Sequence, residues 1–114
     1  MHELSIALSI IELAEIEAER RRVHVSAVHL KLGRLSGVVK DALLASYDLA
    51  AAGTPLEGSR LIVDEIPIRA WCGRCNAARE IDAAEWFTCP QCRSPISQIL
   101  AGKELEVSAL EIAE

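Results

Sequence analysis

Four cysteines form the most informative pattern in the sequence, two Cys-x-x-Cys pairs separated by residues 76–88: Cys72, Cys75, Cys89 and Cys92. A Cys-x-x-Cys turn directs two thiolates to one point, and two such turns supply the tetrahedral set, with bonds of about 2.3 Å, that zinc favours. Gly73 lets the first pair turn tightly, and Pro90 presets the backbone of the second. The pattern predicts one Zn(II) ion held by all four cysteines. Four thiolates leave no open coordination position, so we expect a structural zinc and no catalysis there.

Other uses of the cysteines fit less well. Redox Cys-x-x-Cys motifs usually stand alone at the start of a helix. Disulfides form in oxidising compartments, and the N-terminus lacks the basic start of a secretion signal. A rubredoxin-like iron site is the closest alternative, because Cys-Pro-Gln-Cys resembles one of its turns. The low aromatic content of 4% and the short insertion disfavour iron.

The N-terminus holds a second set of possible ligands. A free Met1 amine, the ionised amide nitrogen of His2 and the His2 imidazole form two fused chelate rings. The amide of Glu3 can replace the amine, and its carboxylate lies at a helix start, where negative charge is favoured. Nitrogen sets of this kind impose the square-planar field that suits Ni(II) or Cu(II). A frayed terminus without function is the alternative.

Hydrophobic periodicity predicts the elements that position these residues. A wide apolar stripe predicts a helix over Glu3–Arg21, and alternation predicts a strand over Val23–Leu32. The later elements are a helix from Val38 to about Ala52, a strand over Arg60–Arg69 and a last strand over Glu104–Ile112. Pro67 places its part of the second strand near an edge or at the strand's end. In the last strand the alternation slips between Val107 and Leu110, which indicates a bulge or a two-sided strand.

The last strand cannot stand alone and most simply returns to the sheet of the first two strands. The sequence therefore predicts an α+β fold, with two helices on a small mixed three-stranded sheet and an inserted zinc-ribbon domain. Residues 1–70 and 101–114 would form the α/β domain, and residues 71–100 the zinc-ribbon domain.

Composition limits the possible functions. The 114 residues carry a net charge of −5, which argues against the basic surface that nucleic acids require. No apolar run approaches the ~20 residues of a membrane span, so we expect a cytoplasmic protein that binds neither membranes nor nucleic acids. The absence of a Gly-x-x-x-x-Gly-Lys-Ser/Thr loop predicts that the chain does not hydrolyse nucleotides.

Several segments together resemble the HypA/HybF family, the nickel metallochaperones of [NiFe]-hydrogenase maturation. The resemblance covers the whole chain. It is carried by Met1–Leu4, by Leu32–Val38, by the Gly53–Gly58 turn, by the two cysteine pairs and by the acidic last strand.

The resemblance implies a metal-binding protein that is not an enzyme. His2, with Met1 and Glu3, would hold Ni(II) as transient cargo in an exposed site, while the cysteines hold structural Zn(II) and shape a docking surface. The implied partners are a nickel-handling maturation GTPase and the [NiFe]-hydrogenase large-subunit precursor; a homo-oligomer and a urease client stay open. Asp41 is displaced from the extra acidic, nickel-associated position that some members have near the start of the second helix, and no histidine follows His29, so neither a further acidic nickel ligand nor a histidine beside the cysteine pairs is expected. A zinc-ribbon interaction module without nickel is the alternative function.

Overall fold

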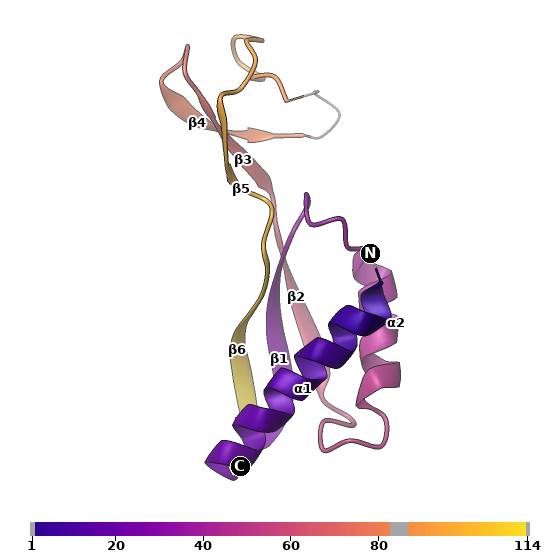
Figure 1. The fold of residues 1–114 in the computed structure, drawn as a ribbon. Coiled ribbons are helices and arrows are strands. Elements are labelled where there is room, and N and C mark those ends of the chain that lie inside the picture. The colour runs from indigo at the N-terminus through magenta and orange to yellow at the C-terminus, as the bar shows by residue number, and fades with distance from the viewer. Residues whose placement is uncertain (1, 83–86, 114) are drawn as a thin grey trace. The chain divides into compact units, whose positions relative to one another are not determined.

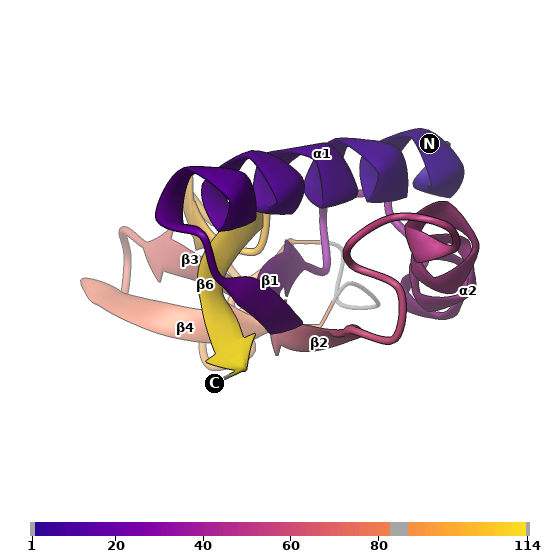
Figure 2. The same ribbon diagram turned by 90° about the horizontal axis from the view of Figure 1, so that it is seen from below.

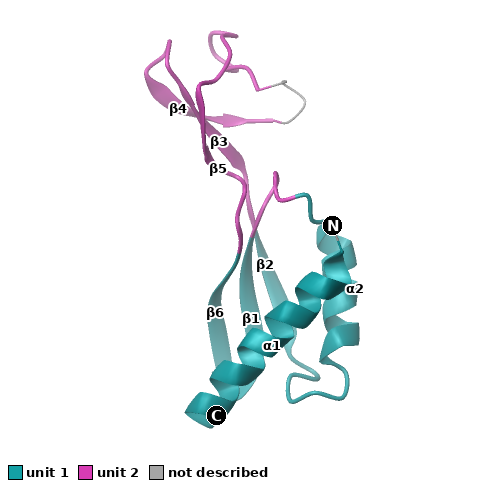
Figure 3. Cartoon of the chain, in the orientation of Figure 1, with its two compact units in different colours: residues 1–31, 37–64, 106–114 teal, residues 32–36, 65–105 magenta. Residues whose placement is uncertain are grey.

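The computed structural model describes residues 2–82 and 87–113 (Figure 1). Its elements are α1 (Glu3–Arg21), β1 (His24–Gly33), α2 (Lys40–Ala51), β2 (Arg60–Ile66), β3 (Ile68–Cys72), β4 (Ala77–Ile81), β5 (Gln98–Ala101) and β6 (Leu105–Ala113). They divide into two compact units (Figure 3). Unit 1 comprises residues 1–31, 37–64 and 106–114, and unit 2 comprises residues 32–36 and 65–105. Neither helix in the described part of the chain has the length and apolar character needed to cross a bilayer.

Helix α1 has the predicted bounds and buries one face. Its buried side chains follow a helical spacing and are Ala7, Ile10, Ile11, Ala14 and Ala18. The helix ends where Arg22 takes a left-handed conformation with φ of 55° and donates its N–H to the carbonyls of Ala18 and Glu19. Glu3 in the first turn and two arginines in the last turn complement the helix dipole.

Unit 1 is built on a sheet with the strand order β2-β1-β6. β1 and β2 run in the same direction and β6 runs opposite to them (Figure 1). Figure 2 shows α1 lying across one face of this sheet, with α2 beside it. The core combines the buried faces of both helices with Val25, Val28 and Leu30 of β1. The predicted arrangement of two helices on a mixed three-stranded sheet is confirmed.

An irregularity in unit 1 matches the slip that the sequence showed in its last strand. Val107 and Leu110 of β6 both pack against the core, although they are three residues apart. In a regular strand, residues at that spacing point to opposite faces. Val25 and Val28 of the neighbouring β1 have the same spacing and are both buried. The two strands therefore depart from strict alternation side by side.

Unit 2 contains a second sheet with the order β4-β3-β5, in which β3 pairs antiparallel with both neighbours. The sequence predicted one strand over residues 60–69, but the structure ends β2 at Ile66 and starts β3 at Ile68. Pro67 has no N–H to donate to a ladder, so it separates strands that belong to different sheets.

The extent of unit 2 differs from the ribbon expected at residues 71–100. It includes β3, which lies within its sheet, together with the last two residues of β2 and residues 32–36. There the N–H of Gly33 donates to the carbonyl of Glu104 at 2.7 Å, and that of Leu35 donates to the carbonyl of Gly102 at 2.6 Å. The core of unit 2 is small, with Ile68, Ala70 and Ile81 buried.

Candidate metal centres

The four cysteines lie in two turns of unit 2. Cys72 ends β3 and pairs with Ala77 of β4, so the first turn closes the β3–β4 hairpin. In the second turn, the N–H of Cys89 donates to the carbonyl of Ser94 at 2.8 Å, and the N–H of Arg93 donates back to the carbonyl of Cys89. The residue after each pair, Asn76 or Arg93, has a positive φ of 55° or 64°. The two turns thus reverse in the same way.

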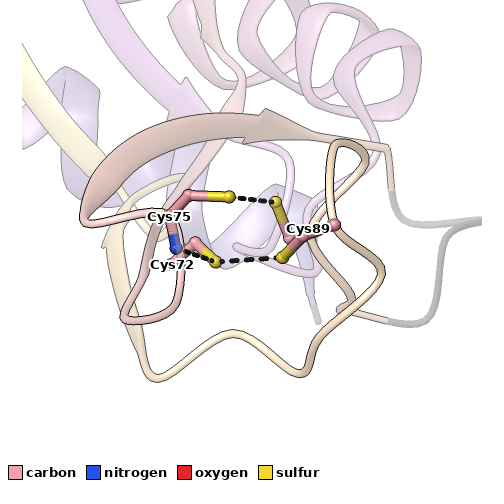
Figure 4. Close-up of side chains that lie close together, drawn as sticks. Cys72, Cys75 and Cys89 are labelled. Carbon is pink, nitrogen blue, oxygen red and sulfur yellow. Dashed lines mark hydrogen bonds between the residues drawn. The ribbon is translucent and has the colours of Figure 1, made fainter.

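The geometry of the sulfur atoms matches a tetrahedral metal site. The four Sγ atoms lie within 4.8 Å of one another. Cys72 Sγ is 3.6 Å from Cys92 Sγ, and Cys75 Sγ is 3.8 Å from Cys89 Sγ. A tetrahedron with metal–sulfur bonds of about 2.3 Å has edges of about 3.8 Å. Figure 4 shows the sulfurs of the labelled cysteines directed toward one another, and all four thiols are free of disulfides.

Hydrogen bonds shift the pKa values of two sulfurs of the cluster in opposite directions. The side chain and backbone of Ser94 donate to Cys92 and lower its pKa to about 6. Hydrogen bonding with Cys92 raises the pKa of Cys75 to about 11. The backbone N–H of Cys75 also donates to Cys72 Sγ at 3.3 Å. Metal binding at this site would therefore displace protons.

The cysteine cluster is closed. Cys72 and Cys89 are fully buried, and Cys75 and Cys92 are half-buried. Among the described residues no histidine or carboxylate joins the four sulfurs. With every coordination position supplied by a thiolate, such a site suits a structural ion.

The second candidate site is the start of α1 in unit 1. His2 is the exposed N-cap residue of this helix and has an extended backbone, with φ of −87° and ψ of 95°. Its carbonyl accepts the N–H of Ile6 at 3.2 Å, so the first helical hydrogen bond is already made. Met1, the third predicted nickel ligand, lies outside the described residues.

Glu3 is tied to the start of α2. Its Oε2 accepts the backbone N–H of Val39, the N-cap residue of α2, at 3.1 Å. Val39 has no side-chain cap of its own, so the carboxylate of Glu3 satisfies a donor at that end of the helix. The backbone N–H groups of Val39 and of Glu3 itself hold the pKa of this carboxyl below its usual value.

Comparison with known proteins places this architecture in a family. The model of the family described as "HypA: Hydrogenase/urease nickel incorporation, metallochaperone, hypA" matches residues 1–112. The chain belongs to the HypA family. A hydrogenase maturation factor HypA from Roseiflexus sp. (strain RS-1) is 48% identical over 112 residues, which cover 97% of this chain and 91% of that protein. One from Geobacter sulfurreducens is 41% identical and covers 98% of this chain and 99% of its own length.

Solved HypA structures share the fold. The solution structure of the Ni metallochaperone HypA from Helicobacter pylori aligns with a TM-score of 0.66 at 23% identity, covering 98% of this chain and 97% of that chain. A second HypA solution structure aligns with a TM-score of 0.72, also at 23% identity, covering 99% and 97%. The expected resemblance to HypA/HybF is thus confirmed, and these two likenesses support the fold.

Sequence reasoning about this HypA chain missed two contacts of its candidate sites. The bond from Val39 to Glu3 joins positions 36 residues apart, and no local pattern announces it. The guanidinium of Arg79 hydrogen-bonds to the sulfurs of Cys75 and Cys89. In the sequence, the only indication of the contact between Arg79 and the sulfurs is that a cationic residue follows the first cysteine pair by a few positions.

Proposed function

We propose that this HypA protein binds Ni(II) at its N-terminus and delivers it to the large-subunit precursor of a [NiFe]-hydrogenase. The observation that carries the proposal is the family match, which begins at Met1 and runs through both cysteine pairs. The family is one of metallochaperones for nickel incorporation, which favours nickel transfer over a zinc-only interaction module. We expect no catalysis by the chain itself and place it in the cytoplasm.

His2 is the central ligand of the proposed nickel site. Because α1 begins at Glu3, the amides of His2 and Glu3 precede or belong to the first turn, whose N–H groups have no intrahelical acceptor. The amide nitrogen of His2 does not support the helix, and that of Glu3 donates to its own carboxylate rather than to the helix, so both could bind Ni(II) together with the imidazole. The His2 side chain is exposed, so a partner can approach and exchange ligands.

The proposed role of Glu3 follows from its contact with α2. Its carboxylate already accepts the N–H of Val39, so we assign nickel binding to its backbone nitrogen and a positioning role to its side chain. Anchoring of this carboxylate limits the conformations open to the residues before it. The Met1 amine completes the proposed ligand set.

The four cysteines would hold Zn(II) as a permanent structural ion. Zinc and iron both accept a tetrahedral thiolate set, and we propose zinc because a closed set of four thiolates suits a structural ion. Unit 2 would then offer a stable surface to hydrogenase maturation components. The proposed partners are the nickel-handling maturation GTPase and the hydrogenase precursor.

The test is a metal titration of native protein without a tag. We expect about one Ni(II) and one Zn(II) per chain, with a colourless zinc-loaded sample. His2→Ala should abolish nickel binding and leave zinc in place. His24→Ala is the matched control, because His24 is also exposed and begins β1. One extra residue before Met1 should weaken nickel binding, because it removes the free amine from its chelate position.

Three outcomes would contradict the proposal. Unchanged nickel binding in His2→Ala would remove the N-terminal site. Zinc without specific nickel binding would leave only the interaction module. A red, iron-loaded native sample with thiolate charge-transfer bands would replace structural zinc by a rubredoxin-like centre.

A further inference from the structure

Arg79 lies beside the sulfur cluster in the middle of β4, opposite the fully buried Ala70 of β3. Its guanidinium hydrogen-bonds to the sulfurs of Cys75 and Cys89. Cys75 belongs to the first Cys-x-x-Cys turn and Cys89 to the second. One side chain therefore contacts a sulfur of each turn.

The environment of Arg79 requires a negative partner. The side chain is half-buried, and its Nε is buried without a hydrogen-bond partner among the described residues. A buried donor on a charged group is costly unless opposite charge compensates it. Four thiolates around one Zn(II) carry a net charge of −2, and a guanidinium offers several N–H donors in one plane. The filled sulfur site supplies the compensation that the neutral thiols lack.

We propose that Arg79 is a positioning residue of the zinc site, which ties the two Cys-x-x-Cys turns together and withdraws charge from two of the four sulfurs. This inference rests on the zinc occupancy proposed above. A thiolate that accepts N–H bonds is a weaker nucleophile, so thiol reagents attack it more slowly. The ion is thereby retained while a more labile metal is exchanged at the other end of the chain.

Arg74, an arginine of the first Cys-x-x-Cys turn, provides a matched control. Arg74 lies between Cys72 and Cys75 in the sequence, but its Nη1 donates to Ser94 Oγ at 3.4 Å. Its side chain is exposed, whereas that of Arg79 is half-buried. Replacing Arg74 removes one positive charge from the first turn and leaves the two sulfur contacts of Arg79 in place.

The experiment compares full-length wild type with Arg79→Met, Arg79→Lys and Arg74→Met. Zinc content is measured first, followed by the rate of zinc transfer to a chromophoric chelator in the presence of an alkylating agent. Loss of outer-sphere partners typically weakens metal sites by about 10- to 100-fold, so Arg79→Met should release zinc faster by about that factor. Arg79→Lys keeps the charge but cannot span both sulfurs, and should release zinc at an intermediate rate. Arg74→Met should behave as wild type.

Cobalt substitution gives a readout that fold stability alone does not move. Hydrogen bonds to sulfur stabilise its lone pairs, so their loss should shift the sulfur-to-Co(II) charge-transfer band of Arg79→Met to longer wavelength. A wild-type release rate and band in Arg79→Met would overturn the inference, as would an equal effect of Arg74→Met. If Arg79→Met does not fold, Arg79→Lys decides, and its wild-type behaviour would overturn the inference. Wild-type protein without zinc would instead overturn the zinc part of the proposed function.

Discussion

On the proposed zinc occupancy, removing the metal from the cysteine cluster should unfold unit 2 and leave unit 1 folded. The core cluster of unit 2 has Ile68, Ala70 and Ile81 buried, with Leu35, Ile96 and Ile99 partly buried against them. Burial of Ile68 and Ile81 is worth about 3–6 kcal/mol in total, at about 1.5–3 kcal/mol each. Structural zinc contributes about 10–16 kcal/mol in small modules. The metal therefore contributes more than the core that surrounds it, and the sheet of unit 2 should not persist without it.

Unit 1 should respond differently because its core holds no metal ligand. That core joins buried side chains from both helices and from β1 and β2. Cys89→Ser is the perturbation, and Gln91→Ala is its control, since Gln91 lies in the same turn but is exposed. Chelation of the wild type by a strong zinc ligand gives the same state without a substitution.

The assay follows each unit separately. Amide hydrogen exchange in α1 and β1 reports unit 1, and exchange in β3 reports unit 2. Trp71 of β3 adds a fluorescence signal for unit 2, and the buried Tyr47 of α2 adds a near-ultraviolet signal for unit 1. Protection should fall in β3 and persist in β1. Simultaneous loss in both strands, or full protection of β3 without metal, would refute the reasoning.

Two further predictions concern packing. In Gly33→Ala the new Cβ would clash with the backbone carbonyl of Gly102, which cannot rotate away, so stability to urea should fall by at least the ~1–3 kcal/mol of overpacking. Gly73→Ala is the control, because the nearest atom to its new Cβ would be 3.8 Å away, and its stability should change little. Equal losses of stability in the two variants would contradict this prediction. Tyr47→Phe removes a buried hydroxyl that lies 2.7 Å from Ser59 Oγ, and it should lower the free energy of unfolding in urea by about 0.5–1.5 kcal/mol. If this hydrogen bond is the cause, adding Tyr47→Phe to Ser59→Ala should lower the stability no further than Ser59→Ala alone.

Sequence patterns predicted the features that depend on interactions between residues close together in the chain. The Cys-x-x-Cys turns and the apolar stripe of α1 depend on neighbours within a few residues, so spacing alone located them. The slip between Val107 and Leu110 was also visible, because it breaks a strict alternation. Pro67 indicated a strand end, but the start of a second sheet at Ile68 depends on pairing with β4 and β5. That pairing joins distant segments, and one strand pattern does not identify its partners.

The missed contacts of the candidate sites have the same origin. In the sequence, Glu3 is recognisable only as an acidic residue in the first turn of a helix, yet its carboxylate also accepts the backbone N–H of Val39 at the start of another helix. In the sequence, Arg79 is recognisable only as a polar residue of a strand, yet its side chain hydrogen-bonds to Cys75 of the first turn and Cys89 of the second. Both are single polar side chains whose partners are set by tertiary packing. Hydrophobic periodicity does not identify such residues, because it depends only on repeated apolar positions.

The donor atoms of the two sites explain how one short chain could keep two metals apart. Four soft thiolates in a tetrahedron suit zinc and hold it without an open position. On the proposed assignment, a set of amide, imidazole and amine nitrogens at the N-terminus would favour a planar field, which suits Ni(II) and does not stabilise Zn(II). The His2 side chain is exposed, whereas Cys72 and Cys89 are fully buried, so exchange should be fast at one site and slow at the other. On the proposed assignment, a nickel-free preparation should therefore still contain zinc, and a zinc-free preparation should lose unit 2 while its His2 site still binds Ni(II).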